Sequence, residues 1–367
     1  MNLFNNIMSQ RIVISLDAMG GANAPRAVIE GASIALNKNP NLYFKIFGNQ
    51  QLIGNLFEQF PILKENYEFI ETGTYISDDE QPIKALKNGV NSSMRKAIDA
   101  VKENAAVACV SSGNTGALMV MAKLVLGELP GIKRPAIVGV VPNLNGGTVM
   151  LDLGANAECD ETNLFQFALM GDCFAKIILD KKSPTIGLLN VGVEQIKGRE
   201  IEKKTYNLLK KSGLNFIGYV EGHDLTKGVV DVVVTDGFSG NIVLKTAEGT
   251  ARLLMQIMKQ GFQNNLSSKI GGLLAKKSLK ESFKSVDPNV NNGAMFIGVN
   301  GIVVKSHGGA EAIGFANAIN VAYDLAQRNI NQEIIKEFDI LQGEMSLGQN
   351  IVEKIKKTSA RILGIGS

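Results

Sequence analysis

Tryptophan is absent from this 367-residue chain, and tyrosine, cysteine and histidine are scarce, with 6, 3 and 2 copies. The lack of Trp argues against a binding surface built on aromatic stacking with bases or sugars. The two histidines, His223 and His307, are too few for a His-rich metal site, and we expect no metal. An odd number of cysteines in a long chain does not make a disulfide framework, so a reducing compartment is expected.

Long apolar runs and a large charge of one sign are missing as well. No stretch of about 18 uncharged apolar residues is present, so we expect no membrane-spanning helix. Residues 1–10 lack a basic segment followed by an apolar core. We therefore expect a loose tail there instead of a secretory signal, and a cytoplasmic protein. The net charge of +3 is too small to indicate bulk nucleic-acid binding, and 45% hydrophobic residues exclude disorder as the main state.

Short β-branched runs alternate with helical patterns along the chain, which predicts one three-layer α/β domain over residues 11–345. Several runs lack polar alternation, as is typical of strands buried on both faces of a parallel sheet. Ligands bind such sheets at the carboxyl ends of the strands. The predicted strands are Ile12–Leu16, Tyr43–Gly48, Glu68–Thr72, Val107–Ser111, Ala136–Val141, Thr148–Asp152, Thr185–Asn190, Asn215–Val220, Val229–Thr235 and Met295–Val304.

Two helical patterns stand out. Apolar residues spaced by three or four from Ile83 to Val101 predict one helix. Residues Thr250–Lys284 predict a projecting helical hairpin, at about residues 250–284, and residues 346–367 a C-terminal helical segment. For the hairpin, the residues leave three interpretations open: an ordinary core face with a solvated charged face, a dimer contact, or an amphipathic surface that touches a membrane.

Four predicted strands end in glycine-rich polar turns: Asp17–Pro25, Ser111–Gly116, Leu151–Asn156 and Thr235–Asn241. Small residues at a helix N-terminus direct backbone N–H groups at an anion, and the helix dipole favours negative charge there. Plain helix capping, by Asn114 or Thr115 in the second turn, is the alternative. After the third turn, the carboxylates of residues 158–161 fit helix capping better than a metal site.

Four cations near these turns could neutralise a phosphate or a developing oxyanion. They are Lys197, Lys245, Lys305 and His307, although a lone lysine is more often a solvated surface residue. Dinucleotide, P-loop, G-x-S-x-G and kinase motifs are all missing. The three cysteines have apolar or helical surroundings and are expected to be buried structural thiols. A protein with several anion sites and no evident nucleophile suits a reaction in which the anion itself attacks.

Together these motifs resemble the bacterial phosphate acyltransferase family, PlsX. The pieces occur in family order from about residue 11 to residue 325, nearly the whole chain, and ten such pieces in order are highly specific. They are Leu16-Asp-Ala-Met-Gly-Gly21, Ser92-Ser-Met94, Ser112-Gly-Asn-Thr-Gly-Ala-Leu118, Arg134-Pro-Ala136, Leu151-Asp-Leu-Gly-Ala-Asn156, Gly187-Leu-Leu-Asn190, Ile196-Lys-Gly198, Asp236-Gly-Phe238 with Gly240-Asn241, Leu244-Lys-Thr246, and Gly298-Val-Asn-Gly301 with Lys305-Ser-His-Gly308.

The chain departs from the family pattern in the first turn and at one later position. Members usually have Asp at position 22 and His at position 23, where this chain has Ala22 and Asn23, and they often have Arg where it has His223. The first departure puts in doubt an essential carboxylate in that turn.

The resemblance implies a Rossmann-like α/β/α fold similar to phosphate acetyltransferases and to the isocitrate/isopropylmalate dehydrogenase superfamily. It implies transfer of a long-chain acyl group from acyl carrier protein to inorganic phosphate. The acyl phosphate then acylates glycerol 3-phosphate through a glycerol-3-phosphate acyltransferase in phospholipid biosynthesis. A homodimer, no organic cofactor and peripheral membrane contact are also implied.

Combining both lines of reasoning gives a set of expected site residues. Expected catalytic residues, including oxyanion and proton-donor roles, are Asn156, Lys197, Asn241, Lys245, Lys305 and His307. Expected phosphate- or substrate-binding residues are Asp17, Gly20, Gly21, Ser112, Gly113, Asn114, Thr115, Asp152, Asp236 and Gly237.

An acidic carrier protein should dock on a basic face, for which Lys133, Arg134, Lys276, Lys277, Lys280 and Lys284 are the candidates. The same lysines could face anionic lipid. Two rival functions remain: a short-chain acetyltransferase that uses coenzyme A thioesters, and a non-catalytic scaffold that binds the carrier or a membrane, which Ala22 keeps open. A Rossmann dehydrogenase fits less well, because its fingerprint is missing.

Overall fold

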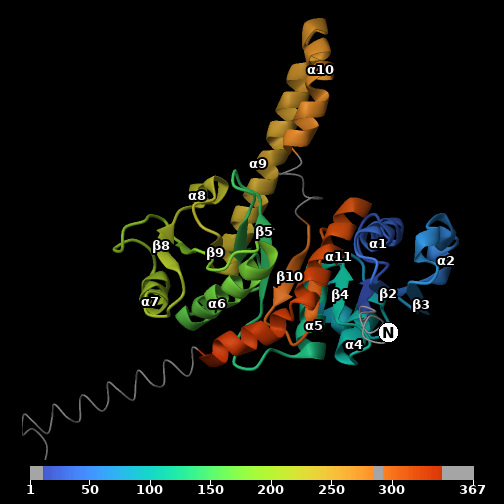
Figure 1. The fold of residues 1–367 in the computed structure, drawn as a ribbon, viewed down its shortest axis with the longest axis horizontal. Coiled ribbons are helices and arrows are strands. Elements are labelled where there is room, and N and C mark those ends of the chain that lie inside the picture. The colour runs from blue at the N-terminus through green and yellow to red at the C-terminus, as the bar shows by residue number, and fades with distance from the viewer. Residues whose placement is uncertain (1–10, 284–291, 341–367) are drawn as a thin grey trace, which may run out of the picture.

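The computed structural model describes residues 11–283 and 292–340 (Figure 1). The tail at 1–10, Lys284 and the C-terminal segment 346–367 lie outside the described residues. The strands are β1 (Ile12–Asp17), β2 (Leu42–Gly48), β3 (Tyr67–Glu71), β4 (Ala108–Ser111), β5 (Ala136–Val141), β6 (Thr148–Leu151), β7 (Ile186–Leu189), β8 (Phe216–Val220), β9 (Val232–Val234), β10 (Ala294–Ile297) and β11 (Ile302–Lys305).

Helices alternate with these strands. They are α1 (Arg26–Lys38), α2 (Gln50–Ile53), α3 (Pro82–Asn88), α4 (Ser93–Lys102), α5 (Thr115–Leu126), α6 (Glu161–Ile178), α7 (Glu200–Leu209), α8 (Gly222–Lys227), α9 (Gly237–Gln263), α10 (Leu266–Phe283) and α11 (Ala312–Gln327), with 3-10 turns η1 (Leu56–Gln59) and η2 (Pro61–Leu63).

The strands form one mixed sheet in the order β3-β2-β1-β4-β11-β10-β5-β6-β9-β7-β8. Strands β1 to β4 and β11 run parallel to one another. Strand β10 is antiparallel to both of its neighbours, so β5 runs in the direction of β11. Strand β6 is antiparallel to β5, and β9, β7 and β8 follow β6. The two halves of the sheet therefore point their carboxyl ends to opposite edges.

Helices cover both faces of the sheet, which confirms the three-layer α/β/α prediction. One apolar core includes Val28 of α1, Phe167 of α6 and Phe315 of α11, all fully buried. The other core includes Ile98 of α4 and Leu118 of α5, also fully buried. The sheet between them is apolar on both sides, which explains why its central strands show no polar alternation.

Two predicted elements are wrong in detail. The single strand expected at Met295–Val304 is an antiparallel pair, β10 and β11, joined by a turn in which Gly298 has φ of +93°. The helix expected across Ile83–Val101 is two helices, because Ser92 caps the second one: its side chain accepts from the backbone N–H of Arg95. An apolar spacing of three or four continues across the break and hides it.

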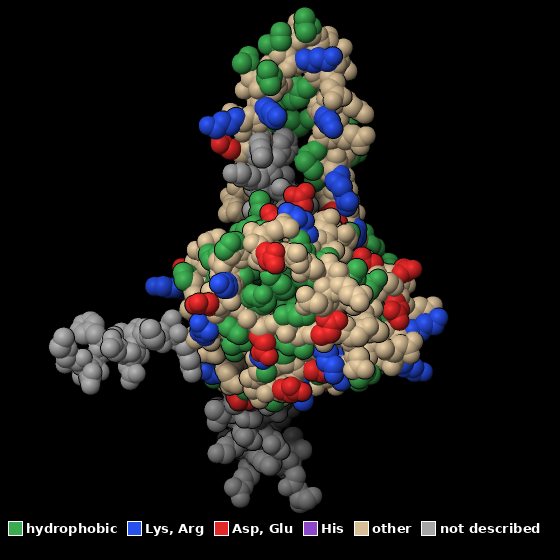
Figure 2. All heavy atoms as spheres, turned by 90° about the vertical axis from the view of Figure 1, so that its right-hand side faces the viewer, with side chains coloured by type: hydrophobic (Ala, Val, Ile, Leu, Met, Phe, Trp, Pro, Cys, Tyr) green, Lys and Arg blue, Asp and Glu red, His purple; other side chains and the backbone are tan. Residues whose placement is uncertain are grey.

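The predicted hairpin is present and projects from the body of the protein (Figure 1). Its first helix, α9, begins at Gly237 instead of near Thr250, because α9 is continuous from the sheet edge to the tip. Figure 2 shows hydrophobic and basic side chains interspersed over the projection. Leu273, Leu274 and Lys276 of α10 are exposed. Among the helices of the described chain, none is long and apolar enough to cross a membrane.

Candidate active site

Asp17, the last residue of β1, joins the ends of β1 and β4 to the start of α4. Its carboxylate accepts hydrogen bonds from the hydroxyls of Ser93 at 2.6 Å and Ser111 at 2.7 Å, and from the N–H of Met19. Burial raises the pKa of Asp17, while these hydrogen bonds oppose the rise. The carboxylate oxygens are occupied by these protein donors, and a negative charge repels anions. Asp17 therefore positions the surrounding turns and does not itself bind a phosphate.

Glycines bring the first two turns into direct contact. A Cβ on Gly20 would lie 2.6 Å from the backbone nitrogen of Gly113 and from the Asp17 carboxylate. Gly21 has φ of +93°, and a Cβ there would lie 2.8 Å from the Ser112 hydroxyl. That hydroxyl donates to the carbonyl of Gly20 at 2.7 Å. The turns after β1 and β4 therefore form one continuous backbone surface.

The N-terminus of α5 lies in this surface. Asn114 caps the helix by accepting from the N–H of Ala117, and its amide donates to the carbonyls of Asp78 and Glu80 at 2.9 Å each. The capping interpretation is thus confirmed for Asn114. Within residues 11–283 and 292–340, the N–H groups of Thr115 and Gly116 have no protein acceptor, so they are free to bind an anion.

Lys305 supplies a positive charge beside this helix end. It is the last residue of β11, and its Nζ donates to the carbonyl of Ser112 at 3.1 Å and to the carbonyl of Ser306. Burial lowers the pKa of Lys305 to about 8, against the opposing effect of the carboxylates of Asp78 and Asp17. A cation held over a helix N-terminus is a physical basis for binding phosphate.

His307 lies next along the chain and faces the side of α9. Its backbone N–H donates to the Asn292 side chain at 3.0 Å, and its side chain is exposed. Desolvation lowers the pKa of His307; Glu248 of α9 opposes this shift, and Lys305 and Lys245 add to it. The exposed Lys245 pairs with Glu248 at 3.0 Å. Helix α9 thus brings further charge to the ends of β4 and β11.

The third turn, after β6, lies at the opposite edge of the sheet and satisfies its own hydrogen bonds. The buried Asp152 carboxylate accepts from four backbone N–H groups, those of Ile137, Gly154, Ala155 and Asn156. The Asn156 amide donates to the same carboxylate and to the carbonyl of Pro135. Burial raises the pKa of Asp152, and these bonds oppose the rise. The side-chain amide of Asn156 is occupied by these bonds, and no cation in the described ranges pairs with Asp152.

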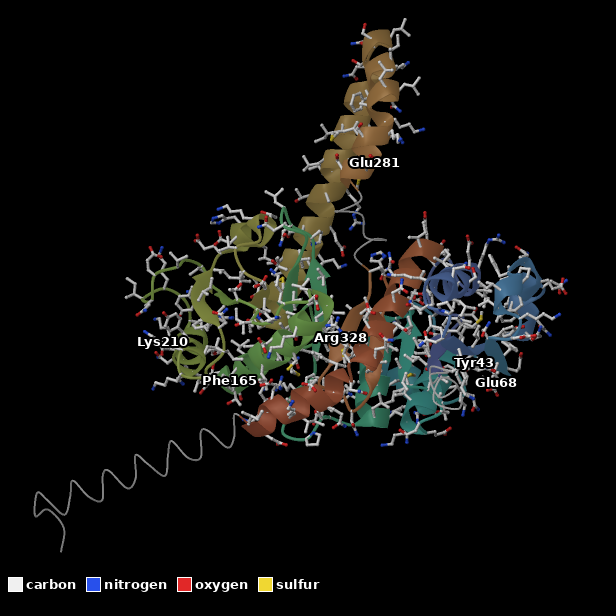
Figure 3. All side chains as sticks on the ribbon, viewed as in Figure 1. Tyr43, Glu68, Phe165, Lys210, Glu281 and Arg328 are labelled. Atoms are coloured by element: carbon white, nitrogen blue, oxygen red, sulfur yellow. The ribbon has the colours of Figure 1, made fainter. Side chains whose placement is uncertain are left out.

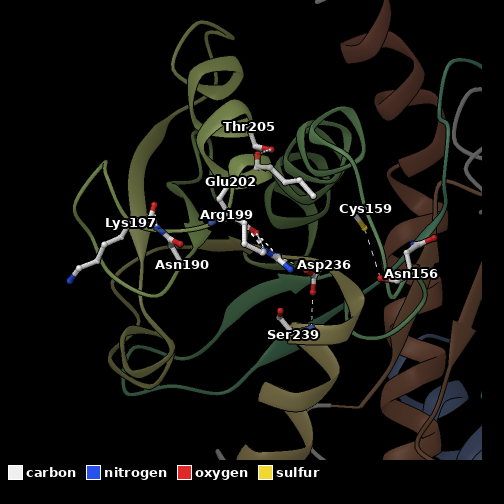
Figure 4. Close-up of polar contacts among 10 residues, drawn as sticks. Asn156, Cys159, Asn190, Lys197, Arg199, Glu202, Thr205, Asp236 and Ser239 are labelled. Atoms are coloured by element: carbon white, nitrogen blue, oxygen red, sulfur yellow. Dashed lines mark hydrogen bonds and ion pairs between the residues drawn. The ribbon is translucent and has the colours of Figure 1, made fainter.

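The fourth turn also closes on itself, as Figure 4 shows. Asp236 caps α9 by accepting from the N–H of Ser239 at 2.7 Å, and it accepts from the Arg199 guanidinium at 2.6 Å. Although burial opposes it, these bonds lower the pKa of Asp236. Arg199 also pairs with the buried Glu202. Gly237 donates its N–H to the carbonyl of Asn156, which joins the third turn to the fourth.

Two predicted catalytic residues lie apart from Lys305, His307 and Lys245, which we call the Lys305 cluster. Lys197 is exposed, pairs with Glu194 at 2.8 Å and points away from Asp236 (Figure 4). Asn241 is exposed on the second turn of α9, against Gly154 of the third turn. The structure therefore separates the predicted site into two groups, and places the cations Lys305, His307 and Lys245 with the first and second turns.

The acidic residues of two groups form helix caps. Asp160 forms a capping box with Asn163 at the start of α6, as the capping interpretation predicts. In the described part of the chain, Glu221, His223 and Asp224 bring three ligand atoms within 4.8 Å of one another. Asp224 already accepts from the N–H of Glu221 as part of a helix cap, and exposed acidic clusters of this kind are common without an ion.

The predicted basic face is divided between two places. Lys276 and Lys277 are exposed on α10, which carries Lys280 as well, while Lys284 is outside the described residues. Lys133 and Arg134 precede β5, at the sheet edge opposite to Lys305, where Arg134 donates to the carbonyl of Glu158. Of the described candidates, Lys276 and Lys277 therefore lie on the side of Lys305.

Four residues that contact or act electrostatically on the predicted site residues were not predicted from the sequence: Asp78, Ser93, Arg199 and Glu248. Ser93 lies in a motif that the resemblance includes, so its position was a usable signal. Asp78 and Glu248 act through their charge on Lys305 and His307 from a loop and a helix far away in sequence, which no local pattern reveals.

Comparison with known proteins agrees with this geometry. A family model described as "Fatty acid synthesis protein" matches residues 12–333. A phosphate acyltransferase of Rhodospirillum centenum is 49% identical over 340 residues, 92% of this chain and 96% of that protein. Another, of Paramagnetospirillum magneticum, is 47% identical over 345 residues, 93% and 98% of the two chains.

Solved structures show the same fold at low identity. A phosphotransacetylase from Streptococcus pyogenes superposes with a TM-score of 0.58 at 18% identity, covering 88% of this chain and 96% of that one. The EutD phosphotransacetylase from Staphylococcus aureus gives 0.53 at 13% identity, covering 90% and 96%. At such identity the likeness concerns the fold alone.

Proposed function

The chain belongs to the phosphate acyltransferase family and is an acyltransferase, and on this premise we propose that it transfers a long-chain acyl group from acyl carrier protein to inorganic phosphate. The products would be acyl phosphate and the free carrier. The acyl phosphate would serve glycerol 3-phosphate acylation in phospholipid biosynthesis, in the cytoplasm. The observation that carries the proposal is Lys305 beside the free N–H groups at the start of α5.

Phosphate would bind between these two features. The N–H groups of Thr115 and Gly116 and the Lys305 ammonium would hold its oxygens, and the contact between the first two turns keeps this surface rigid. One phosphate oxygen attacks the thioester carbonyl carbon, and the tetrahedral adduct collapses with loss of the carrier thiolate. Phosphate is already an anion at neutral pH, so much of the rate gain comes from positioning.

Carrier docking is proposed on the hairpin, because its exposed lysines would attract an acidic partner. Reversing Lys276 and Lys277 to Glu should raise the KM for the acyl carrier severalfold and leave the KM for phosphate unchanged. Reversal of Lys210 and Lys211, two exposed residues that directly follow α7, is the matched control. Figure 3 shows Lys210 far from the hairpin. An unchanged carrier KM in the hairpin variant would exclude this surface.

We also propose that the hairpin forms a homodimer contact and touches the membrane peripherally. The support is an apolar groove between α9 and α10, with a volume of about 520 Å³, and exposed leucines along both helices. Analytical ultracentrifugation and flotation with anionic vesicles test the two contacts separately. A protein that is monomeric in ultracentrifugation would refute the dimer contact, and one that does not float with vesicles would refute the membrane contact.

The decisive experiment follows the reaction itself. Purified protein is incubated with palmitoyl-acyl carrier protein and phosphate, and both free carrier thiol and acyl phosphate are measured, with acetyl-coenzyme A in parallel. Phosphate-dependent release from the carrier supports the proposal. A preference for acetyl-coenzyme A would support the short-chain alternative, and binding without turnover would support the scaffold.

A further inference from the structure

His307 is held by a hydrogen bond that determines which ring nitrogen carries its proton. The backbone N–H of Gly309 donates to Nδ1 of His307 at 3.1 Å. A backbone N–H has no acceptor capacity, so Nδ1 must present a lone pair. In a neutral imidazole the proton then resides on Nε2. Among residues 11–283 and 292–340, Nε2 makes no hydrogen bond, and the side chain is exposed.

The surroundings also oppose a second proton on the ring. Protonation of Nδ1 would set two donors, Nδ1–H and the Gly309 N–H, against each other. Lys305 on β11 and Lys245 and Arg252 on α9 add positive charge, and only Glu248 on α9 favours the charged ring. Desolvation, with a further contribution from the three cations, lowers the pKa of His307 below its usual value, although Glu248 opposes the shift. At neutral pH the ring is therefore neutral, with one donor, Nε2–H.

We propose that His307 donates a hydrogen bond through Nε2–H to the thioester carbonyl oxygen and stays neutral throughout the reaction. The inference rests on the proposed acyl transfer to phosphate and divides the chemical roles within it. The carbonyl oxygen becomes an oxyanion in the tetrahedral adduct, where a fixed donor stabilises it most. A neutral imidazole is a poor proton source, because loss of Nε2–H would leave an imidazolate.

Lys305 then supplies the proton that the reaction needs. A phosphate oxygen forms a bond to the carbonyl carbon, and the carbonyl electron pair moves to the oxygen beside His307. The pair returns as the C–S bond breaks, and the departing thiolate takes a proton from the Lys305 ammonium. Neutral Lys305 regains its proton from water before the next turnover. No oxidant, reductant or additional reactant is required.

The tautomer can be measured directly, without substrate. Long-range ¹H–¹⁵N spectra of the full chain labelled at histidine nitrogens contain two rings, and a His223→Gln variant leaves only that of His307. The expected result is an Nε2–H ring that is neutral at pH 7 and above. An imidazolium at neutral pH, or an Nδ1–H ring, would overturn the inference.

Activity variants test the role of the donor. His307→Gln can place an amide N–H near the position of Nε2, whereas His307→Asn reaches only as far as Nδ1 and His307→Ala removes both. We expect the Ala and Asn variants to lose about 100- to 1000-fold in kcat and the Gln variant to recover much of it. The KM for phosphate should stay unchanged in all three. Equal losses in the Gln and Ala variants would overturn the assignment.

Substrates with different leaving groups distinguish the proposed role of His307 from that of Lys305. A thioester of a more acidic thiol needs no proton at departure, so at saturating phosphate it should restore turnover in Lys305→Met but not in His307→Ala. The reverse pattern would exchange the two roles and overturn the inference. If the wild-type protein transfers no acyl group to phosphate, the proposed function fails, whatever the spectra show; if it does and the ring is Nδ1–H, only this inference fails.

Discussion

The charge of Lys305 should set the alkaline limit of activity. Burial lowers its pKa to about 8, so about nine in ten side chains carry a proton at pH 7 and about one in ten at pH 9. The charged form is the active one in our proposal, because it binds phosphate and protonates the thiolate. Activity is therefore full below this pKa and is lost as the pH rises through it. We expect kcat/KM to fall about tenfold between about pH 7 and pH 9.

Two variants make this prediction specific. Lys305→Arg keeps its charge over the whole range, so its pH profile should lose the decline near pH 8 even if its overall rate is lower. Lys305→Met should lose about 10- to 100-fold at pH 7 and below, which corresponds to the 1.5–3 kcal/mol of a charge-assisted contact, and the loss should shrink as the wild-type side chain becomes neutral. The assay is release of carrier thiol at saturating phosphate, corrected for spontaneous thioester hydrolysis. Enzyme exposed to pH 9 and returned to pH 7 must regain its rate. A decline near pH 8 that persists in Lys305→Arg would refute the assignment.

Three further substitutions test the structural parts of the site by thermal or denaturant unfolding. Gly20→Ala should destabilise by about 1–3 kcal/mol, since its Cβ would meet backbone and carboxylate atoms at 2.6 Å; Gly308→Ala, whose nearest contact is at 3.7 Å, is the control and should change stability little. Asp152→Ala removes an acceptor shared by four buried or part-buried N–H groups and should cost about 3 kcal/mol or more, with Asp152→Asn costing less; equal costs would contradict the hydrogen-bond argument. Ser92→Ala removes the cap of α4 and should cost about 1 kcal/mol, and an unchanged midpoint would show that the cap does not define the helix start.

Strand positions were predictable because burial on both faces leaves continuous β-branched runs in the sequence. Strand β5 was predicted at its observed bounds, and β1 and β2 within one residue. The β10–β11 turn was not, because Gly298 to Gly301 interrupts an apolar run for only a few residues. A turn that short leaves the period of the flanking strands almost unbroken, so local pattern alone merges the two strands into one.

The direction of the strands was the main feature that sequence could not supply. Chain order suggested a parallel sheet, in which all four glycine-rich turns would share one edge. Strand β10 runs antiparallel to both neighbours and β5 to β6, so the turns after β6 and β9 face the other edge. Pairing between segments as distant as β5 and β10 depends on how the cores on the two faces are filled, which no local signal records.

The four turns look alike in sequence because the same residues both build a turn and bind a ligand. Each has an Asp or Ser near the strand end, glycines for close approach, and an Asn or Ser within the turn. The turns differ in which hydrogen-bond donors and cations remain without a protein partner after folding. In the third turn, the Asp152 carboxylate accepts hydrogen bonds from the nearby N–H groups. In the fourth turn, Arg199 is already paired with Asp236 and Glu202. At α5 the cap uses the N–H of Ala117, and the Nζ of Lys305 is held by neutral carbonyl oxygens. A turn becomes a site when its donors outnumber its own acceptors, and that balance is set by residues that come from distant strands.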